Sequence, residues 1–257
     1  MTNKEGLDPQ TIEVLARLVL TAVKQGWFDK ILNVFRKPHR VLVLGATGTG
    51  KTNMIDSFTQ IMPEAIHYMA RTRYPKSRSV KNMGEVFKVV DTPGDELYES
   101  IRMPEIRKAM ARGLSGIINV VSFGYHEYRI GKREAIDSSG NVRVDFLERH
   151  RDVEKRALGE WVSLLGDREI AGWLITVVAK ADLWWDRKED VLRHYESGPY
   201  FDALGNARSL RPIVLPYCSV FHRFYDEGPL SGCFDDSDRT RLRTDLLCSL
   251  LQAVGKG

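Results

Sequence analysis

The sequence predicts an α/β fold in which a mostly parallel, six-stranded sheet carries helices on both faces. Three observations support this prediction. Short apolar runs alternate with longer amphipathic runs along the chain, as expected for repeated strand–helix units. A glycine-rich turn joins the first apolar run to a helical stretch. Polar residues follow directly after several apolar runs, and ligands of parallel sheets bind at the carboxyl ends of the strands.

Two amphipathic helices are expected before the sheet. The first extends from Gln10 to Lys24, and the second contains Trp27 to Phe35 and stops at Pro38. The aromatic face and basic end of the second helix suit an anionic membrane, so peripheral membrane contact through residues 27–40 is one interpretation. Packing on the main domain or on a partner is the interpretation we favour. We therefore divide the chain into a helical extension, residues 1–39, and a main domain, residues 40–257.

The main domain is expected to begin with a strand that leads into the glycine-rich turn. Its order is predicted to be β-α-β-β-α-β-α-β-α-β-α, with the second strand between Thr72 and the Met83-Gly84 turn. Residues 124–144 are polar and are interpreted as an inserted loop, with a small hairpin as one form of it, so the insertion extends over about 124–150. The other predicted elements are strands near 41–44, 85–91, 116–123, 173–179 and 212–216, and helices near 53–61, 97–113 (interrupted by Pro104), 146–165, 187–204 and 240–254.

Composition excludes several classes of protein. The 257 residues are 43% hydrophobic and 28% charged, which is ordinary for a globular protein. The net charge of +4 is too small to predict a specific nucleic-acid partner. Three widely spaced cysteines are typical of reduced thiols. No apolar run is long enough to span a bilayer, and charges interrupt the N-terminus where a signal peptide would be apolar. We therefore expect a cytoplasmic location.

The glycine-rich turn has the pattern of a phosphate-binding loop. It reads Gly45-Ala46-Thr47-Gly48-Thr49-Gly50-Lys51-Thr52, between the apolar run 41–44 and a predicted helix. Glycines allow backbone N–H groups to surround an anion, and the helix N-terminus adds partial positive charge. Lys51 is expected to reach the β- and γ-phosphates, and the Thr52 hydroxyl to bind Mg²⁺. The alternative is a glycine-rich turn that binds nothing.

A second candidate motif follows the strand 85–91, which ends in Asp91-Thr-Pro-Gly94. A strand of this kind places a carboxylate at the same sheet edge as the phosphate loop. Asp91 is then expected to hold Mg²⁺ through water, and the Gly94 N–H to contact the γ-phosphate. The alternative is an ordinary strand followed by a Pro-Gly turn.

Two further strand ends, Ala179-Lys180-Ala181-Asp182 and Tyr217-Cys218-Ser219-Val220, complete a resemblance to the small-GTPase superfamily, the translation-factor-related class of P-loop NTPases. The resemblance covers residues 40–254. It rests on Gly45–Thr52, on Asp91–Gly94 as switch II, on Ala179–Asp182 as the guanine-reading motif and weakly on Ser219-Val220. It implies a three-layer P-loop NTPase fold that binds GTP or GDP with Mg²⁺.

The resemblance assigns base recognition to the last two motifs. Asp182 can accept from N1–H and N2–H of guanine, whereas adenine lacks this donor pair. The Lys180 stem can lie along the base. A backbone N–H near Val220 can donate to guanine O6. The alternative for Asp182 is a helix N-cap without a ligand.

Three positions depart from the family pattern. Ala179 replaces the amide that normally ties this loop to the phosphate loop, and septins are similar in having A-K-A-D. Asp95 stands where Ras-like members carry a water-positioning glutamine, which places rapid intrinsic hydrolysis in doubt. Switch I should supply a Mg²⁺-binding threonine, for which Thr72 fits better than Ser77 or Ser79.

The function predicted from these motifs is Mg²⁺-dependent hydrolysis of GTP by a nucleotide-dependent switch, with Lys51, Thr72 and Gly94 in catalysis. The expected partners are an effector or activating protein at switch I and at the insertion 124–150, or a second copy across the nucleotide face. His126, in the insertion, is interpreted as a surface residue, with a catalytic role as the alternative. Two other functions stay open: a septin-like assembly module with little turnover, and an ATP-dependent phosphotransferase whose lid uses the arginines of residues 124–151.

Overall fold

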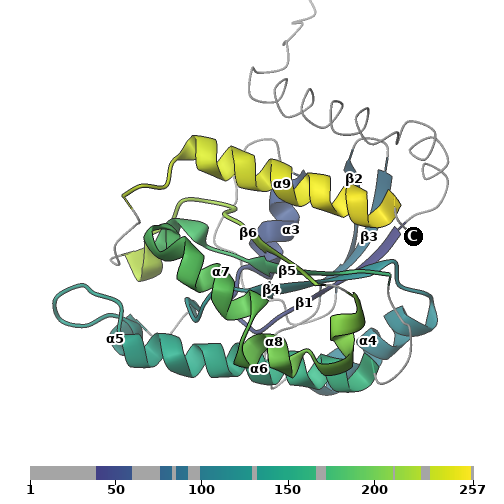
Figure 1. Ribbon diagram of the computed structural model, residues 1–257, viewed down its shortest axis with the longest axis horizontal. Helices are drawn as coiled ribbons and strands as arrows, with labels where there is room; N and C mark the ends of the chain where they lie inside the picture. The colour runs from purple at the N-terminus through teal and green to yellow at the C-terminus, as the bar shows by residue number, and fades with distance from the viewer. Residues whose placement is uncertain are drawn as a thin grey trace, which may run out of the picture.

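The computed structural model describes residues 39–59, 76–82, 85–91, 99–128, 132–165, 172–210, 212–226 and 232–255. These residues form a three-layer α/β structure around one six-stranded sheet (Figure 1). The predicted N-terminal helices lie outside the described residues. The strands are β1 (His39–Leu44), β2 (Lys76–Asn82), β3 (Glu85–Asp91), β4 (Gly116–Val121), β5 (Leu174–Val178) and β6 (Ile213–Pro216). The α-helices are α3 (Lys51–Thr59), α4 (Glu99–Ala111), α5 (Lys132–Ala135), α6 (Val144–Leu165), α7 (Lys188–Glu196), α8 (Pro199–Ala203) and α9 (Asp236–Gly255).

The sheet has the strand order β2-β3-β1-β4-β5-β6. β1 pairs in parallel with β3 and β4, and the parallel pairing continues through β5 to β6. Only β2, at one edge, runs antiparallel to its neighbour β3. The mostly parallel sheet predicted from the alternation of strands and helices is therefore confirmed. Its consequence is that the carboxyl ends of five neighbouring strands meet at one edge.

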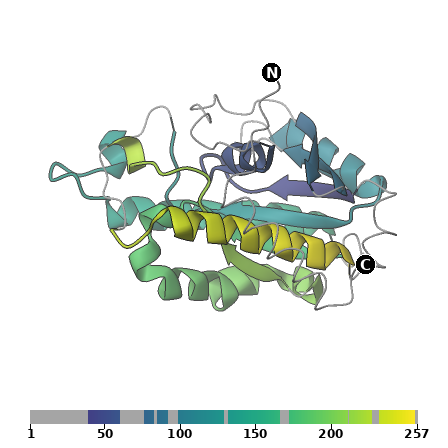
Figure 2. The same ribbon diagram turned by 90° about the horizontal axis from the view of Figure 1, so that it is seen from above.

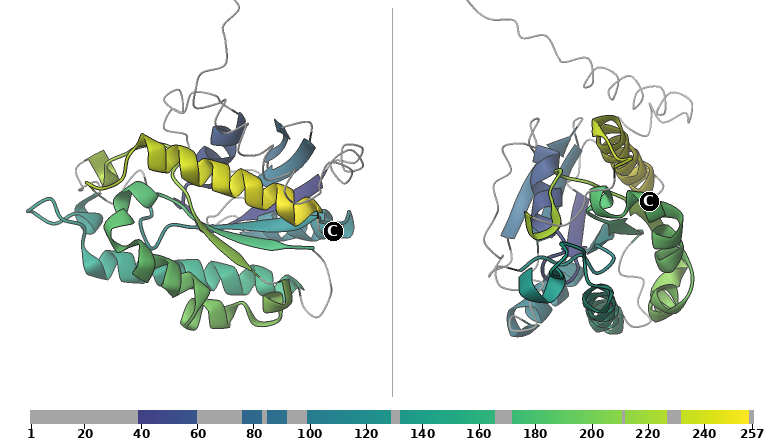
Figure 3. Two further views of the ribbon diagram at one scale, coloured as in Figure 1. Left: turned by 45° about the horizontal axis from the view of Figure 1, so that its top comes forward. Right: turned by 90° about the vertical axis from the view of Figure 1, so that its left-hand side faces the viewer.

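Alternating side chains of the central strands pack into two cores. On β1, Leu42 and Leu44 belong to the core beneath α4, α6, α7 and α8, whereas Val41 and Val43 belong to the core beneath α3 and α9. This alternation is the two-residue period of a strand that is buried on both faces. Figures 2 and 3 show α3 and α9 on one side of the sheet and α6 and α8 on the other.

Two elements differ from the sequence-based expectation. Pro104 lies inside the continuous helix α4 and does not interrupt it; the side chain is exposed, and near the start of a helix the missing N–H removes only one backbone bond. The insertion is also more structured than a loop. It contains α5, an isolated bridge between Ile136 and Val142, and the first turns of α6, which begins at Val144. Among the described helices, none is long and apolar enough to cross a membrane.

Candidate functional site

The glycine-rich turn lies between β1 and α3, as predicted. Gly45, Gly48 and Gly50 have φ values of 137°, 80° and 94°, which side chains with a Cβ rarely adopt. A Cβ at Gly45 would lie 2.1 Å from the Val120 carbonyl oxygen, and one at Gly48 would lie 2.8 Å from the Glu127 backbone. Glycine is therefore needed at Gly45 and Gly48 both for conformation and for space, and at Gly50 for conformation.

Lys51 is folded over this turn. Its Nζ donates to the carbonyl oxygens of Gly45, at 2.9 Å, and Ala46, at 2.8 Å, and the residue is only 7% exposed. The Thr49 hydroxyl donates to the same Ala46 oxygen at 3.0 Å. These bonds hold a buried positive charge inside the turn, where an anion on the backbone N–H groups would meet it.

Two further features of the turn, the Thr47 hydroxyl and the N-terminus of α3, suit a phosphate ligand. The buried Thr47 Oγ1 has no hydrogen-bond partner among the described residues, so a polar group is available for a ligand. The Gly50 carbonyl accepts from the Met54 N–H at 2.9 Å, which begins α3 directly after the turn. The N-terminus of α3 thus adds its partial positive charge to the charge of Lys51.

The predicted Mg²⁺ ligands are only partly described. Thr52 is half-buried in the first turn of α3. Asp91 ends β3, and its backbone pairs with Val43, close to the start of the glycine-rich turn. The register therefore brings Asp91 to the sheet edge that carries Lys51 and Thr52. Thr72 and Gly94, together with Asp95, lie outside the described residues. In the described part of the chain, no cluster of His, Cys, Asp and Glu side chains could hold a metal by itself.

The A-K-A-D segment continues directly from β5. Ala179 N donates to the Val121 oxygen at 2.7 Å, and Ala181 N donates to the Tyr217 oxygen at 3.0 Å, so the segment is fastened to both neighbouring strand ends. The Ala179 methyl group lies 4.0 Å from the position of a Cβ at Gly50. The A-K-A-D segment therefore lies beside the phosphate loop at Gly50.

Asp182 is almost fully buried, with 2% of its surface exposed. One carboxylate oxygen, Oδ2, accepts from the His222 backbone N–H at 3.1 Å, and the other, Oδ1, lies 3.3 Å from the Cys218 Sγ. Burial raises the pKa of Asp182 to about 6, although both of these donors lower it. Two hydrogen bonds leave lone pairs on a carboxylate that can accept four, so Asp182 retains the capacity to bind a donor pair.

Cys218 is the residue of the last strand end that the sequence-based reasoning missed. Its Sγ lies between Asp182 Oδ1, at 3.3 Å, and the Val220 carbonyl oxygen, at 3.2 Å. Ser219 and Val220, which the sequence singled out, are half-buried beside it, and their base contacts stay predictions. Cys218 could have been found from its place directly after the apolar run 213–217, but only the fold brings it to Asp182.

Glu127, in the loop after β4, joins the strand ends to one another. Its Oε2 accepts from Lys180 Nζ at 2.8 Å, while its Oε1 accepts from the Tyr225 N–H at 2.9 Å and contacts His222 Nε2 at 3.0 Å. Lys180 Nζ donates also to the Tyr125 carbonyl oxygen at 2.6 Å. The sequence offered no pattern that distinguishes this glutamate from other polar residues of the insertion.

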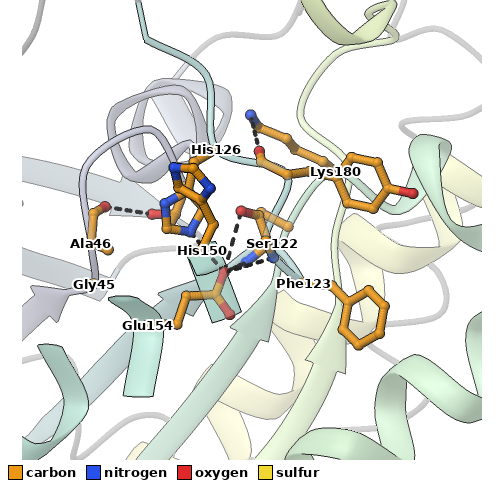
Figure 4. Close-up of polar contacts among 12 residues, drawn as sticks. Gly45, Ala46, Ser122, Phe123, His126, His150, Glu154 and Lys180 are labelled. Atoms are coloured by element: carbon orange, nitrogen blue, oxygen red, sulfur yellow. Dashed lines mark hydrogen bonds and ion pairs between the residues drawn. The ribbon is translucent and has the colours of Figure 1, made fainter. Parts of the chain in front are cut away.

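His126 is fully buried, so its interpretation as a surface residue is wrong. Its Nε2 lies 2.9 Å from Glu154 Oε1, and the same oxygen accepts from the N–H groups of Ser122 and Gly124 at 2.8 Å and 3.2 Å (Figure 4). The Tyr195 hydroxyl donates to Glu154 Oε2 at 2.6 Å. The burial of His126 comes from tertiary packing, because α6 supplies Glu154 and α7 supplies Tyr195 to this network. The network anchors the loop that carries Glu127.

Comparison with known proteins agrees with this geometry. Residues 40–152 match the model of a family described as 50S ribosome-binding GTPase. No curated protein shows a significant match. Among solved structures, the chain is similar to a dimerization-deficient mutant of Toc33 from Arabidopsis thaliana, with a TM-score of 0.50 and 14% identity over 94% of this chain and 92% of that one. At this identity the likeness concerns the fold. The family model covers less than half of this chain, so the two findings together support an α/β fold of the P-loop GTPase kind.

Proposed function

We propose that this chain, whose α/β fold is similar to that of P-loop GTPases, binds guanine nucleotides with Mg²⁺, hydrolyses GTP to GDP and phosphate, and acts as a nucleotide-dependent switch. The proposal extends to a cytoplasmic location. The main support for guanine-nucleotide binding is the position of two residues. Lys51, in the turn after β1, and Asp182, in the segment after β5, lie at the same edge of the parallel sheet. The Lys51 ammonium group suits phosphates, and the Asp182 carboxylate suits a guanine base.

The phosphate end of the proposed site depends on Lys51 and on the N–H groups of residues 45–52. When a nucleotide binds, we expect Lys51 Nζ to exchange its bonds to the Gly45 and Ala46 carbonyls for the β- and γ-phosphates. Thr52 and Asp91 would hold Mg²⁺, with Thr72 as the proposed switch I ligand. The ion would neutralise charge on the phosphates. Gly94 would sense the γ-phosphate through its N–H.

The base end depends on Asp182. Its remaining lone pairs can accept from N1–H and N2–H of guanine, while adenine presents no such pair of donors. A buried acceptor that stays unpaired is costly, so this site should discriminate strongly against ATP. The burial of Asp182 supports this view, because few water molecules compete for its oxygens.

The decisive experiment is competition of GTP, GDP and ATP against a fluorescent GDP derivative with Mg²⁺, on the wild type and on Asp182→Ala. We expect guanine nucleotides to bind more tightly than ATP by a factor of about 100 or more, and the variant to lose this preference. Lys51→Ala should weaken all three nucleotides alike. Equal binding of ATP and GTP by the wild type would contradict the proposal and favour a phosphotransferase.

A second candidate function is a nucleotide-dependent assembly module with little turnover. The Toc33 structure is of a dimerization-deficient mutant, which indicates that Toc33 dimerizes, and the A-K-A-D segment resembles septins. Light scattering of the chain with GDP and with a non-hydrolysable GTP analogue, together with single-turnover hydrolysis, separates the two functions. A nucleotide-dependent dimer without hydrolysis would favour assembly, whereas a monomer that hydrolyses GTP would favour the switch.

A further inference from the structure

The loop after β4, residues 122–128, contacts the phosphate loop and the loops after β5 and β6. Glu127 N lies 3.4 Å from the Gly48 oxygen in the phosphate loop. The Glu127 carboxylate contacts Lys180 in the loop after β5 and both His222 and Tyr225 in the loop after β6. One residue therefore touches the phosphate loop through its backbone and both base-reading loops through its side chain.

We infer that Glu127 is a positioning residue for guanine recognition, because its carboxylate holds Lys180 and the loop 217–226 in the arrangement that reads the base. The inference rests on the proposed function and adds a residue that the sequence motifs do not contain. Glu127 itself is not proposed to touch the nucleotide. It acts through Lys180, whose stem would lie along the base, and through His222. The His222 ring contacts Glu127, and its backbone N–H donates to Asp182.

The Glu127 carboxylate forms charge-assisted hydrogen bonds with partly buried partners. Its side chain is 18% exposed, and those of Lys180 and His222 are 17% and 22% exposed. Lys180 Nζ and the carboxylate form a charge-assisted hydrogen bond at 2.8 Å. Partial burial limits screening by water, so such a pair restrains both partners more than a surface pair would.

Backbone strain supports the same inference. Within the described part of the chain, four residues other than glycine have φ in the left-handed region: Phe123 at 52°, Lys180 at 60°, Tyr225 at 51° and Asp226 at 64°. All four lie in the loops that Glu127 connects. Residues persist in this region only where surrounding contacts determine their conformation. Lys180 and Tyr225 are themselves donors to Glu127, so its carboxylate is one of those contacts.

The hydroxyl of Tyr225 strengthens the connection from the other side. It accepts from the Tyr128 N–H at 2.9 Å, one residue beyond Glu127. Tyr225 is thus bound to the loop 122–128 at both its backbone N–H and its side chain. Loss of the Glu127 carboxylate would remove one bond from the Tyr225 N–H and one from Lys180 together, while the backbone contact of Glu127 N to Gly48 would remain.

The test measures dissociation constants for GDP, ADP and tripolyphosphate with Glu127→Gln. Glutamine preserves shape but removes the charge and presents an N–H₂ group to the surrounding donors. We expect GDP to bind about tenfold more weakly, as a charge-assisted hydrogen bond predicts, and the preference for GDP over ADP to fall. Tripolyphosphate, which would contact the phosphate loop and not the base-reading loops, should bind almost unchanged.

The matched control is Glu134→Gln, an exposed glutamate of α5 with the same charge change, which should leave all three constants unchanged. A second variant, His222→Gln, keeps the backbone N–H to Asp182 and should weaken GDP in the same direction but by less. It preserves the test if Glu127→Gln fails to fold. A wild type that prefers GDP while both Glu127→Gln and His222→Gln keep the full preference would overturn the inference alone. A wild type without any preference for GDP would overturn the proposed function.

Discussion

The Cys218 thiol and the Asp182 carboxylate contact each other over 3.3 Å in the interior of the protein. They come from the ends of neighbouring parallel strands, β6 and β5. The thiol is almost fully buried, and burial beside the Asp182 charge holds its pKa well above the ordinary value. Cys218 is therefore a protonated donor, and it helps to hold the carboxylate that would read guanine.

Replacement of this donor should weaken both the fold and the proposed site. Cys218→Ala is expected to lower the free energy of unfolding by about 1–3 kcal/mol, because a buried carboxylate loses a hydrogen bond. GDP affinity should fall with it. Cys218→Ser keeps an O–H donor and should retain most of the affinity. Urea denaturation and GDP titration measure both effects, and Cys233→Ala, at an exposed cysteine, is the control. Equal loss in the serine and alanine variants would contradict the donor role.

Guanine binding should depend on pH through Asp182. Its pKa of about 6 means that the carboxyl takes up a proton just below neutrality, and a protonated carboxyl cannot accept from both guanine donors. The dissociation constant for GDP should rise about tenfold for each pH unit below 6. Asp182→Asn should show no such rise. Tripolyphosphate, measured in the same buffers, corrects for titration of the phosphates.

Stability should follow the opposite trend at this residue. A carboxyl whose pKa is raised in the folded state binds its proton more firmly when folded than when unfolded. Its contribution to the free energy of unfolding therefore falls as pH rises from its unfolded pKa to about 6. Urea titrations at pH 4.5 and 7.5 measure the free energy of unfolding of the wild type and of Asp182→Asn. The stability of the wild type relative to Asp182→Asn should be lower at pH 7.5 than at pH 4.5. No change in this difference would argue against a raised pKa.

Glu154→Gln should be strongly destabilising. Burial raises the pKa of Glu154, but bonds from His126, Tyr195 and Ser122 more than offset it, so the pKa is lowered. The resulting stabilisation is present above the unfolded pKa and is lost as pH falls through the folded value. We expect a loss of about 2–4 kcal/mol near neutral pH, measured by urea denaturation.

Glu148→Gln is the matched control for this prediction, since Glu148 lies on the same helix, α6, and its side chain is 61% exposed. Its contact with Arg151 is a surface ion pair at 3.8 Å, and such pairs contribute little. A Glu154→Gln variant as stable as this control would show that the buried network does not anchor the loop after β4.

Gly48→Ala should impair nucleotide binding beyond what its backbone conformation alone would cause. Gly48 and Gly140 have nearly equal φ values, 80° and 82°, so alanine at either costs about 1–2 kcal/mol. At Gly140 a Cβ would meet nothing within 4 Å, whereas at Gly48 it would meet the Glu127 backbone at 2.8 Å. Thermal unfolding and GDP titration should therefore show a larger loss for Gly48→Ala. Equal losses would mean that the loop after β4 is not seated on the phosphate loop.

The sequence determined the fold class and the phosphate end of the site. A short apolar strand, glycines with a lysine and a following helix are contiguous in the chain, so their local geometry follows from neighbours in sequence. The continuous apolar run 41–44 also predicted a buried strand, and the cores on both faces of β1 confirm it. These features depend on interactions within a few residues, and the residue types record them directly.

The tertiary structure alone decided which residues surround Asp182. Glu127 lies more than 50 residues from Lys180 and more than 90 from Tyr225, and Cys218 is 36 residues from Asp182. His126 was misread because its burial comes from α6 and α7, which follow later in the chain. Contacts of this kind arise when parallel strands bring their loops to one edge. No local pattern encodes them, because each partner is chosen by the packing of the whole sheet.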